Sequence, residues 1–444
     1  MEQMKVFDRF LGCERTVHGE DLDGWKIPAP STPNMLETPS AANLVTVCVQ
    51  PYIKPSEDGH PEEASLLIVS GADKLVSLYD VQAPYPLLCT LDNLSDSPFL
   101  SGIYLYDGAY RAMTTVSGEL LLFQGPRAIA SRKDHTKHAV DVVSFQEEPP
   151  EVQTTWLATA GWDSRIYIYS ITLLDVGAQI TIGEPLAVIK TATVPECILL
   201  MRSESTGDLV LLASRRDSTC LFYYLVESPF NRLERGHRMN AKSQQLYECP
   251  LLGKQDLAPN SNAWAAFSPA CFAPSPRDPM LLAVATSSKP YMHVIFVRVL
   301  MPFPSASTSP TPGLGAAWRA SQASQSMADR EAAAILAHVN AIAPQTAFSI
   351  PKLVWRPDGS GVWVNGEDGV IRGIEAKTGK LVASLRGGHE PGSKVRTISA
   401  GWARVDYGEN RFEECLRITE LPDQKYNYVQ ISNRDRPIKP ELRK

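Results

Sequence analysis

The segment TAGWDSRIYIYS (159–170) carries the pattern that decides the fold. Small residues end one strand, a polar turn follows, and an alternating strand ends in an aromatic residue. Three more segments share this layout: SGADKLVSLYD (70–80), TVSGELLLFQG (115–125) and ASRRDSTCLFYYL (213–225). The turn residue and the aromatic are six apart in each: Asp73 and Tyr79, Ser117 and Phe123, Asp163 and Tyr169, Asp217 and Tyr223. Successive turns are 44, 46 and 54 residues apart, which is the length of four short strands with their loops.

A later stretch spells out one such unit in full. In LVWRPDGSGVWVNGEDGVIRGIEAKTGKLVASLRGGH (353–389), polar turns at 357–359, 367–369 and 377–380 separate four strand-like runs. The segment 280–299 extends the repeat more loosely. The sequence therefore predicts an all-β fold made of repeated four-stranded sheets.

These repeats resemble the WD-repeat β-propeller family, whose repeats run from Gly-His before the innermost strand to Trp-Asp at the end of the third. The resemblance covers 65–226 and 348–403, and more weakly 244–299. Tyr169 and Ser170 stand where the family has Trp-Asp, and no repeat here ends in that dipeptide. The resemblance implies a divergent member with a seven-bladed propeller.

The pattern predicts six blades inside the chain. A seventh blade can be assembled from 394–402, a strand within 412–431 and an N-terminal strand. The candidates for that N-terminal strand are 5–11 and 44–50, since the family usually closes its ring with such a strand and so removes an exposed sheet edge. The predicted organisation is an N-terminal strand and flexible Pro-rich loop (1–43), propeller blades (44–301 and 346–431), an insertion (302–345) and a basic tail (432–444).

The insertion begins with a low-complexity stretch at 302–327 and continues as ADREAAAILAHVNAIA, which predicts the one convincing helix of the chain. Ser326 and Asp329 are candidates for its N-terminal cap. Four apolar residues form one predicted helix face, which packs back on the propeller or docks into a partner: Ile335, Leu336, Val339 and Ile342.

Composition excludes several classes of protein. The chain has 444 residues, 44% hydrophobic and 21% charged, so it is a folded globular protein. A formal charge of −6 disfavours a general nucleic-acid-coating role. Charged residues interrupt the N-terminal segment, whereas a signal peptide needs a continuous apolar stretch, so we expect no signal peptide. No apolar run reaches the ~18–20 residues that span a bilayer, so we expect no transmembrane helix. Eight cysteines without a C-x-x-C pair read as reduced core residues of an intracellular protein, without a zinc site.

His135, Thr159, Asp163 and Tyr169 offer a choice between a catalytic relay and a structural network. In WD-repeat blades a buried His, Ser or Thr, Asp and aromatic residue form a hydrogen-bonded network, so the resemblance favours that role. It extends the role to Asp73, Asp217, Asp368 and to His389 after Gly388. His135 and His138 also resemble half a metal site, which no second cluster completes, so we expect no metal and no cofactor.

The remaining candidate functional residues lie on the surface. One rim of a propeller carries the residues that precede each turn, and Trp and Arg are the types that most often carry interface energy. The predicted partner-binding residues are Trp162, Arg165, Arg215, Arg216 and Glu367.

The sequence thus predicts a non-catalytic scaffold that binds other proteins and acts as a monomer within a hetero-complex. Two alternatives stay open. The basic C-terminal stretch 425–444, which ends in the tail 432–444, could bind nucleic acid, and an enzyme could use the central channel. An enzyme that uses the channel needs polar innermost strands. The corresponding runs in this sequence are chiefly apolar: VDVVSF, ILLM and KLVW.

Overall fold

Nearly all described secondary structure is β-strand, and one short helix spans 325–334. The computed structural model describes residues 4–8, 13–17, 33–37 and most of 39–432. Its longer gaps are 55–61, 81–85, 148–152, 174–179, 227–245, 302–324, 387–393 and 422–427. For the first three strands and for 401–432 the description covers the backbone alone.

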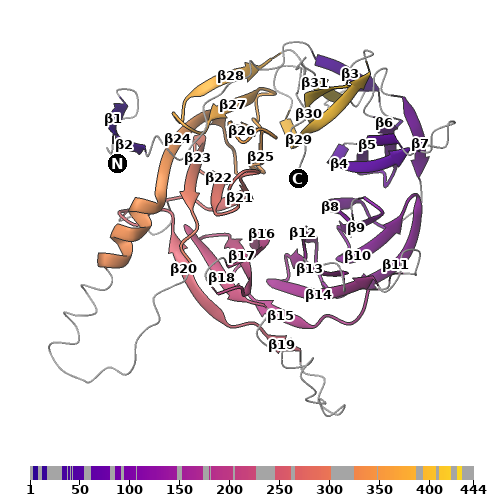
Figure 1. Cartoon of the computed structure of the whole chain (residues 1–444), viewed down its shortest axis with the longest axis horizontal. Helices are drawn as coiled ribbons and strands as arrows, with labels where there is room; N and C mark the ends of the chain where they lie inside the picture. The colour runs from indigo at the N-terminus through magenta and orange to yellow at the C-terminus, as the bar shows by residue number, and fades with distance from the viewer. Residues whose placement is uncertain are drawn as a thin grey trace.

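Six antiparallel sheets stand around a central axis, each with four strands ordered from the axis outward (Figure 1). The first three contain β4 (Leu44–Lys54), β5 (Glu62–Gly71), β6 (Val76–Asp80) and β7 (Leu87–Leu91); β8 (Phe99–Leu105), β9 (Tyr110–Thr115), β10 (Glu119–Gln124) and β11 (Arg127–Lys133); β12 (Ala139–Gln146), β13 (Gln153–Gly161), β14 (Arg165–Leu173) and β15 (Ala187–Lys190). The next three contain β16 (Pro195–Arg202), β17 (Leu209–Arg215), β18 (Cys220–Leu225) and β20 (Leu251–Asp256); β21 (Pro269–Pro274), β22 (Leu281–Thr286), β23 (Tyr291–Arg298) and β24 (Ile335–Pro344); β25 (Leu353–Trp355), β26 (Gly361–Val364), β27 (Ile371–Glu375) and β28 (Leu381–Leu385). The short β19 (Tyr247–Glu248) adds a parallel strand outside β15. The predicted all-β propeller is confirmed.

A further sheet joins the two ends of the chain. It contains β29 (Lys394–Asp406), β30 (Asn410–Leu421), β31 (Tyr428–Ser432) and the N-terminal β3 (Pro33–Glu37), which pairs antiparallel with β31. The expectation that 5–11 or 44–50 closes the ring is wrong. β1 (Met4–Asp8) pairs instead with β2 (Cys13–Val17), and β4 is the innermost strand of its own blade.

The predicted Pro-rich loop within residues 1–43 is wrong for residues 33–37, which form β3. Their mixed composition hides the strand, because an outermost strand is held by backbone pairing along one side. Six blades are described through their side chains. The count of seven stays a prediction.

The cores lie between neighbouring blades. Ile168 of β14 and Leu211 of β17 belong to one buried cluster, and Leu212 of β17 joins a second cluster with Val284 of β22. Because both faces of a middle strand are covered, these strands read as continuous apolar runs. The four aromatics at the predicted offset all lie in third strands and are at most 2% exposed: Tyr79, Phe123, Tyr169 and Tyr223.

The predicted amphipathic helix is wrong beyond residue 334. The helix ends there and β24 follows at once, so Ile335, Leu336, Val339 and Ile342 lie on a strand. β24 is the outermost strand of the blade that begins at β21, and the insertion therefore interrupts one blade between its third and fourth strands. Val339 is 2% exposed and Ile342 is 54% exposed, so the two do not share a face.

No described helix is long and apolar enough to cross a membrane.

Candidate functional site

Strand direction determines which residues meet on one face of the ring. Every blade is an antiparallel sheet that starts at the axis, so the first residues of the innermost strands and the turns between second and third strands lie on the same side. One hydrogen bond shows this directly: Trp162 N, in the β13–β14 turn, donates to the carbonyl of His138 just before β12, at 2.9 Å. We call this side the rim face.

Four residues on the rim face form what we call the rim cluster: His138, Trp162, Glu196 and Arg216. The Trp162 ring is 41% exposed and lies 4.8 Å from the His138 ring, centroid to centroid. The guanidinium carbon of Arg216 lies 5.8 Å from the centroid of Trp162, and Arg216 Nε donates to Glu196 Oε1 at 2.6 Å. The indole is therefore held between an imidazole and a guanidinium while part of it faces solvent.

The rim cluster lies on two adjacent blades and is tied to a third, since His138 and Trp162 belong to the blade of β12–β15 and Glu196 and Arg216 to the blade of β16–β20. His138 Nδ1 donates to the carbonyl of Val116, in the β9–β10 turn, at 2.6 Å. Trp162 lies in the β13–β14 turn and Arg216 follows β17. Because bonds to neighbouring blades hold His138 and Arg216 in place, the exposed indole is presented on a rigid support.

The other predicted partner-binding residues do not join the rim cluster. Arg165 donates to Tyr167 Oη at 3.3 Å within its own blade. The guanidinium carbon of Arg215 stacks 3.6 Å from the Phe222 ring centroid, which turns it away from the rim. Glu367 pairs with Lys394 Nζ at 2.7 Å, and its side chain is only 10% exposed.

The structure brings the predicted network residues of one blade together. His135 Nε2 lies 2.9 Å from Thr159 Oγ1, and His135 Nδ1 lies 3.0 Å from Asp163 Oδ1. Asp163 Oδ2 accepts a bond from Thr136 N at 3.0 Å. Burial raises the pKa of Asp163, but the bonds from His135 and Thr136 outweigh it and leave that pKa below its usual value. Tyr169 Oη donates to Asp134 Oδ2 at 3.0 Å. Tyr169 therefore holds the loop before β12 through Asp134, the residue that precedes His135.

The other predicted network residues lie in different surroundings. Asp73 accepts bonds from Ser40 Oγ at 2.9 Å, and Asp368 pairs with Arg372 through two bonds of 2.5 and 3.0 Å. The network role is wrong for Asp217, which is exposed at a φ of 62°, because it is the tight turn itself. His389 lies outside the described residues, as do residues 433–444 of the basic tail.

A second constellation lies on the innermost strands, and we call it the inner belt: Ser101, Asp141, Cys197 and Cys271. Each is the third residue of an innermost strand, namely β8, β12, β16 and β21. Ser101 Oγ lies 3.4 Å from Asp141 Oδ1, and Asp141 Oδ2 accepts a bond from Ile198 N at 3.0 Å.

The inner belt continues from β16 through β21 to β25. Phe272 N donates to Cys197 Sγ at 3.5 Å, and Cys271 Sγ contacts the Leu353 carbonyl at 4.0 Å. Innermost strands of adjacent blades do not pair through their backbones. These side chains supply the polar links between them instead.

Charges surround the thiols of the inner belt. The hydrogen bond from Cys197 lowers the pKa of Cys271, helped by the Lys352 ammonium and opposed by burial. Burial raises the pKa of Asp141, although Lys352 and the Ile198 amide oppose it. Burial lowers the pKa of Lys352, but the nearby thiols and the carboxylates of Asp141 and Glu196 outweigh it and raise that pKa. Glu196 thus belongs to the rim cluster and also faces the charges of the channel.

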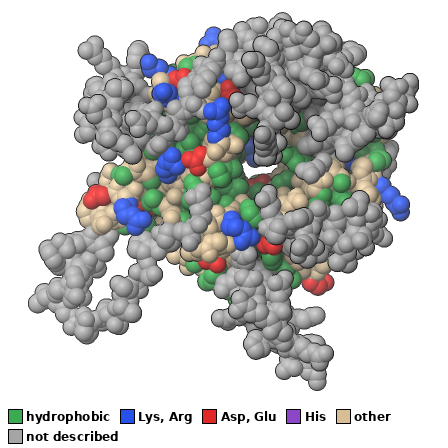
Figure 2. Space-filling view, viewed as in Figure 1, with side chains coloured by type: hydrophobic (Ala, Val, Ile, Leu, Met, Phe, Trp, Pro, Cys, Tyr) green, Lys and Arg blue, Asp and Glu red, His purple; other side chains and the backbone are tan. Residues whose placement is uncertain are grey.

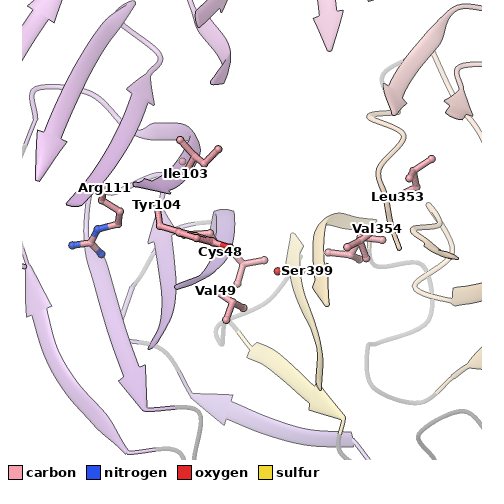
Figure 3. Close-up of a pocket in the computed structure, with 11 residues that line it drawn as sticks. Cys48, Val49, Ile103, Tyr104, Arg111, Leu353, Val354 and Ser399 are labelled. Atoms are coloured by element: carbon pink, nitrogen blue, oxygen red, sulfur yellow. The ribbon is translucent and has the colours of Figure 1, made fainter. Parts of the chain in front are cut away.

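The channel also contains a cavity of about 250 Å³, and Figure 2 shows the hollow at the centre of the ring. Its wall comes from the innermost strands β4, β8, β25 and β29 and from Arg111 of β9. Tyr104 lies beside Cys48, and Val354 and Ser399 lie across the opening (Figure 3). The wall is mixed in polarity. It includes no carboxylate among its lining residues.

The apolar runs VDVVSF, ILLM and KLVW conceal a positional signal for the inner belt. After register shifts near their starts, six innermost strands carry a polar or thiol residue at the third or fourth position: Thr46, Ser101, Asp141, Cys197, Cys271 and Thr397. Each residue alone reads as an ordinary member of an apolar strand. The signal appears when the repeats are aligned on their first strands.

The ring of antiparallel blades, with a central channel and residues displayed on one rim, defines a β-propeller. The chain belongs to the family described as UCP007778, beta-propeller domain, whose model matches residues 53–398. No curated protein matches the chain. Among the residues described, no group of three or more His, Cys, Asp or Glu side chains is placed to hold a metal ion.

Proposed function

We propose that this protein is a non-catalytic scaffold that binds another protein through the rim cluster. The observation that carries the proposal is the exposed Trp162 indole, which contacts Arg216 and His138 on the rim face of two adjacent blades. Trp and Arg are the residues that most often dominate interface energies. A rigid support lowers the entropy lost when a partner docks. In this proposal the chain is an intracellular monomer within a hetero-complex.

The experiment compares partners captured by the tagged full-length protein and by Trp162→Ala. The matched control is Leu251→Ala, which removes another exposed apolar side chain, 53% exposed, from the outer strand β20. We expect Trp162→Ala to lose a stoichiometric partner that Leu251→Ala retains. Equal capture by both folded variants would contradict the proposal.

We also propose that the blades are of the WD-repeat type and that the sheet β29–β30–β31–β3 acts as the seventh blade. The support is the His135–Thr159–Asp163 network and the pairing of an N-terminal with a C-terminal strand. A direct test is the structure determined by crystallography, in which a blade count other than seven would contradict the proposal.

An activity near the channel is the second candidate, because Asp141, Glu196 and Lys352, at the starts of the innermost strands, interact electrostatically with one another. The two candidates make opposite predictions for Asp141→Asn and Lys352→Met. The scaffold proposal expects both variants to capture the same partner as the wild type. A channel activity requires a reaction that either variant abolishes.

A further inference from the structure

Two imidazoles meet on the outer strands of the blade that the insertion interrupts, and we call them the histidine pair. His293 lies in β23 and His338 in β24, and His293 Nδ1 lies 3.0 Å from His338 Nε2. Their ring centroids are 5.0 Å apart, with an angle of 69° between the ring planes. Because a hydrogen bond between two ring nitrogens needs one of them to accept, at least one imidazole is neutral and offers a lone pair.

Strand pairing places both rings on one face of the sheet. In the register of β23 and β24, His293 lies opposite Asn340 and Ile295 lies opposite His338. Since alternate residues of a strand share a face, His293 and His338 are diagonal neighbours on the same side. The Phe267 ring also packs edge-on against His338, with 6.3 Å between the ring centroids. The backbone register and an aromatic neighbour therefore fix where the two imidazoles stand.

The distance between the two nitrogens suits a metal ion. Imidazole nitrogens lie about 2.0–2.1 Å from a bound ion, so two nitrogens 3.0 Å apart subtend an angle of about 90–95° at the ion. That angle separates neighbouring ligands in the tetragonal sites that Cu²⁺ and Ni²⁺ prefer. His338 is exposed and His293 is half-buried, so an ion can reach the histidine pair from solvent.

The chemistry of the donors selects the kind of ion. Imidazole suits late transition metals, whereas Mg²⁺ and Ca²⁺ prefer oxygen ligands. Within the part of the chain that the structure describes, no third His, Cys, Asp or Glu side chain completes a cluster with the histidine pair. Two imidazoles thus supply the protein ligands, and water takes the remaining positions. In the ring that donates the hydrogen bond, the hydrogen moves to the other nitrogen, so that both facing nitrogens carry lone pairs.

We propose that His293 and His338 bind a divalent transition-metal ion, Cu²⁺ or Ni²⁺, that links β24 to β23. β24 begins directly after the helix at 325–334, so it is the strand by which the chain rejoins the blade after the insertion (Figure 1). One ligand from each strand makes the ion a bridge across this joint. The inference is independent of the proposed scaffold function.

This site goes against the expectation of no metal, which rested on His135 and His138. Those two residues are close in the sequence, whereas the members of the histidine pair are 45 positions apart. Only the pairing of β23 with β24 brings them together, and the sequence pattern predicted a helix where β24 lies.

The first measurement uses the full-length wild-type protein without a histidine tag, with NiCl₂ as the probe and MgCl₂ as the control. Hydrogen–deuterium exchange with mass spectrometry follows the amides of 291–298 and 335–344. We expect Ni²⁺ to slow exchange in both strands by about threefold or more, because an ion that binds only the paired strands stabilises them. The proposal is overturned if Ni²⁺ protects neither strand, or if Mg²⁺ protects them equally. This measurement needs no variant, so it stands even if a variant misfolds.

The second measurement removes one ligand at a time. Calorimetric titration with NiCl₂ compares the wild type with His293→Gln and His338→Gln. We expect each variant to lose about tenfold or more in Ni²⁺ affinity, because even changes to the partners of metal ligands cost about 10–100-fold. The matched control is His60→Gln, which removes an imidazole outside the histidine pair and should bind Ni²⁺ as the wild type does. Unchanged affinity in His338→Gln, or an equal loss in His60→Gln, overturns the proposal.

Discussion

Gly161 shows how closely a single residue is constrained in this ring. It ends β13, and a Cβ atom there would clash with the His135 ring and the Asp163 carboxylate. The absence of a side chain therefore lets His135 reach both Thr159 and Asp163. Thr159 is fully buried, so a lost partner would leave its hydroxyl unsatisfied.

Gly161→Ala is expected to lower the free energy of unfolding by about 1–3 kcal/mol, because the new methyl group must displace the network. Gly183→Ala is the matched control, since nothing lies within 4 Å of a Cβ at that position. We expect the control to change stability by less than about 0.5 kcal/mol. Urea unfolding of the two variants measures both values, and equal effects would contradict the network.

The same network predicts how stability depends on pH. Because the pKa of Asp163 is lower in the folded chain than its usual value of 3.8, the carboxylate stabilises the fold above that value. This contribution is lost as the pH falls through the folded pKa. As the pH is lowered from 5 to below 3.8, Asp163→Asn should therefore lose less free energy of unfolding than the wild type. Urea midpoints measured across that range check the difference, and parallel curves would contradict it.

At the scale of elements, β24 shows where sequence pattern and structure part. The segment after residue 334 has apolar residues at helical spacing, yet it is the outermost strand of a blade. Ala337, Val339, Ala341 and Ala343 alternate as buried residues along it. The alanines read as helix formers in isolation, but the unpaired edge of β23 decides the outcome because tertiary pairing overrides propensity.

Val339→Ala and Ile342→Ala distinguish the strand from a helix face. Val339 belongs to a buried cluster, so its truncation should cost about 2 kcal/mol. Ile342 is 54% exposed, so its truncation should cost less than about 0.5 kcal/mol. Denaturant unfolding compares the two, and equal large losses would fit a shared buried face and contradict the strand.

Most blades could be predicted from the sequence because their second and third strands repeat a local pattern. The turn residues and buried aromatics from Asp73 to Tyr223 place four hairpins correctly. The closing strand β3 could not be predicted, since its pairing with β31 joins residues about 400 positions apart. The rim cluster was half predicted: Trp162 and Arg216 were singled out, but His138 and Glu196 join them through contacts between blades.

At the scale of the whole molecule, the ring depends on strands from both ends of the chain. β3 is the outermost strand of the sheet that lies between β28 and β4, and it gives β31 its second partner (Figure 1). Without β3, the unpaired edge of β31 would be exposed to other chains.

Removal of residues 1–37 should therefore lower the thermal midpoint and increase aggregation, whereas removal of 1–32 should have a smaller effect because β3 is kept. Thermal scanning and light scattering measure the two outcomes. Indistinguishable behaviour of the two truncations would show that β3 does not stabilise the ring.

The central claim is that the rim cluster is a docking surface for another protein. A photo-crosslinking amino acid placed at Lys137, an exposed position beside His138 that keeps the rim cluster intact, tests it most directly. Position 87 on the exposed outer strand β7 is the control. Irradiation in the cells that produce the protein should give one discrete heteromeric adduct from position 137 and none from position 87. The absence of an adduct at position 137, or the same adducts from both positions, would contradict the claim.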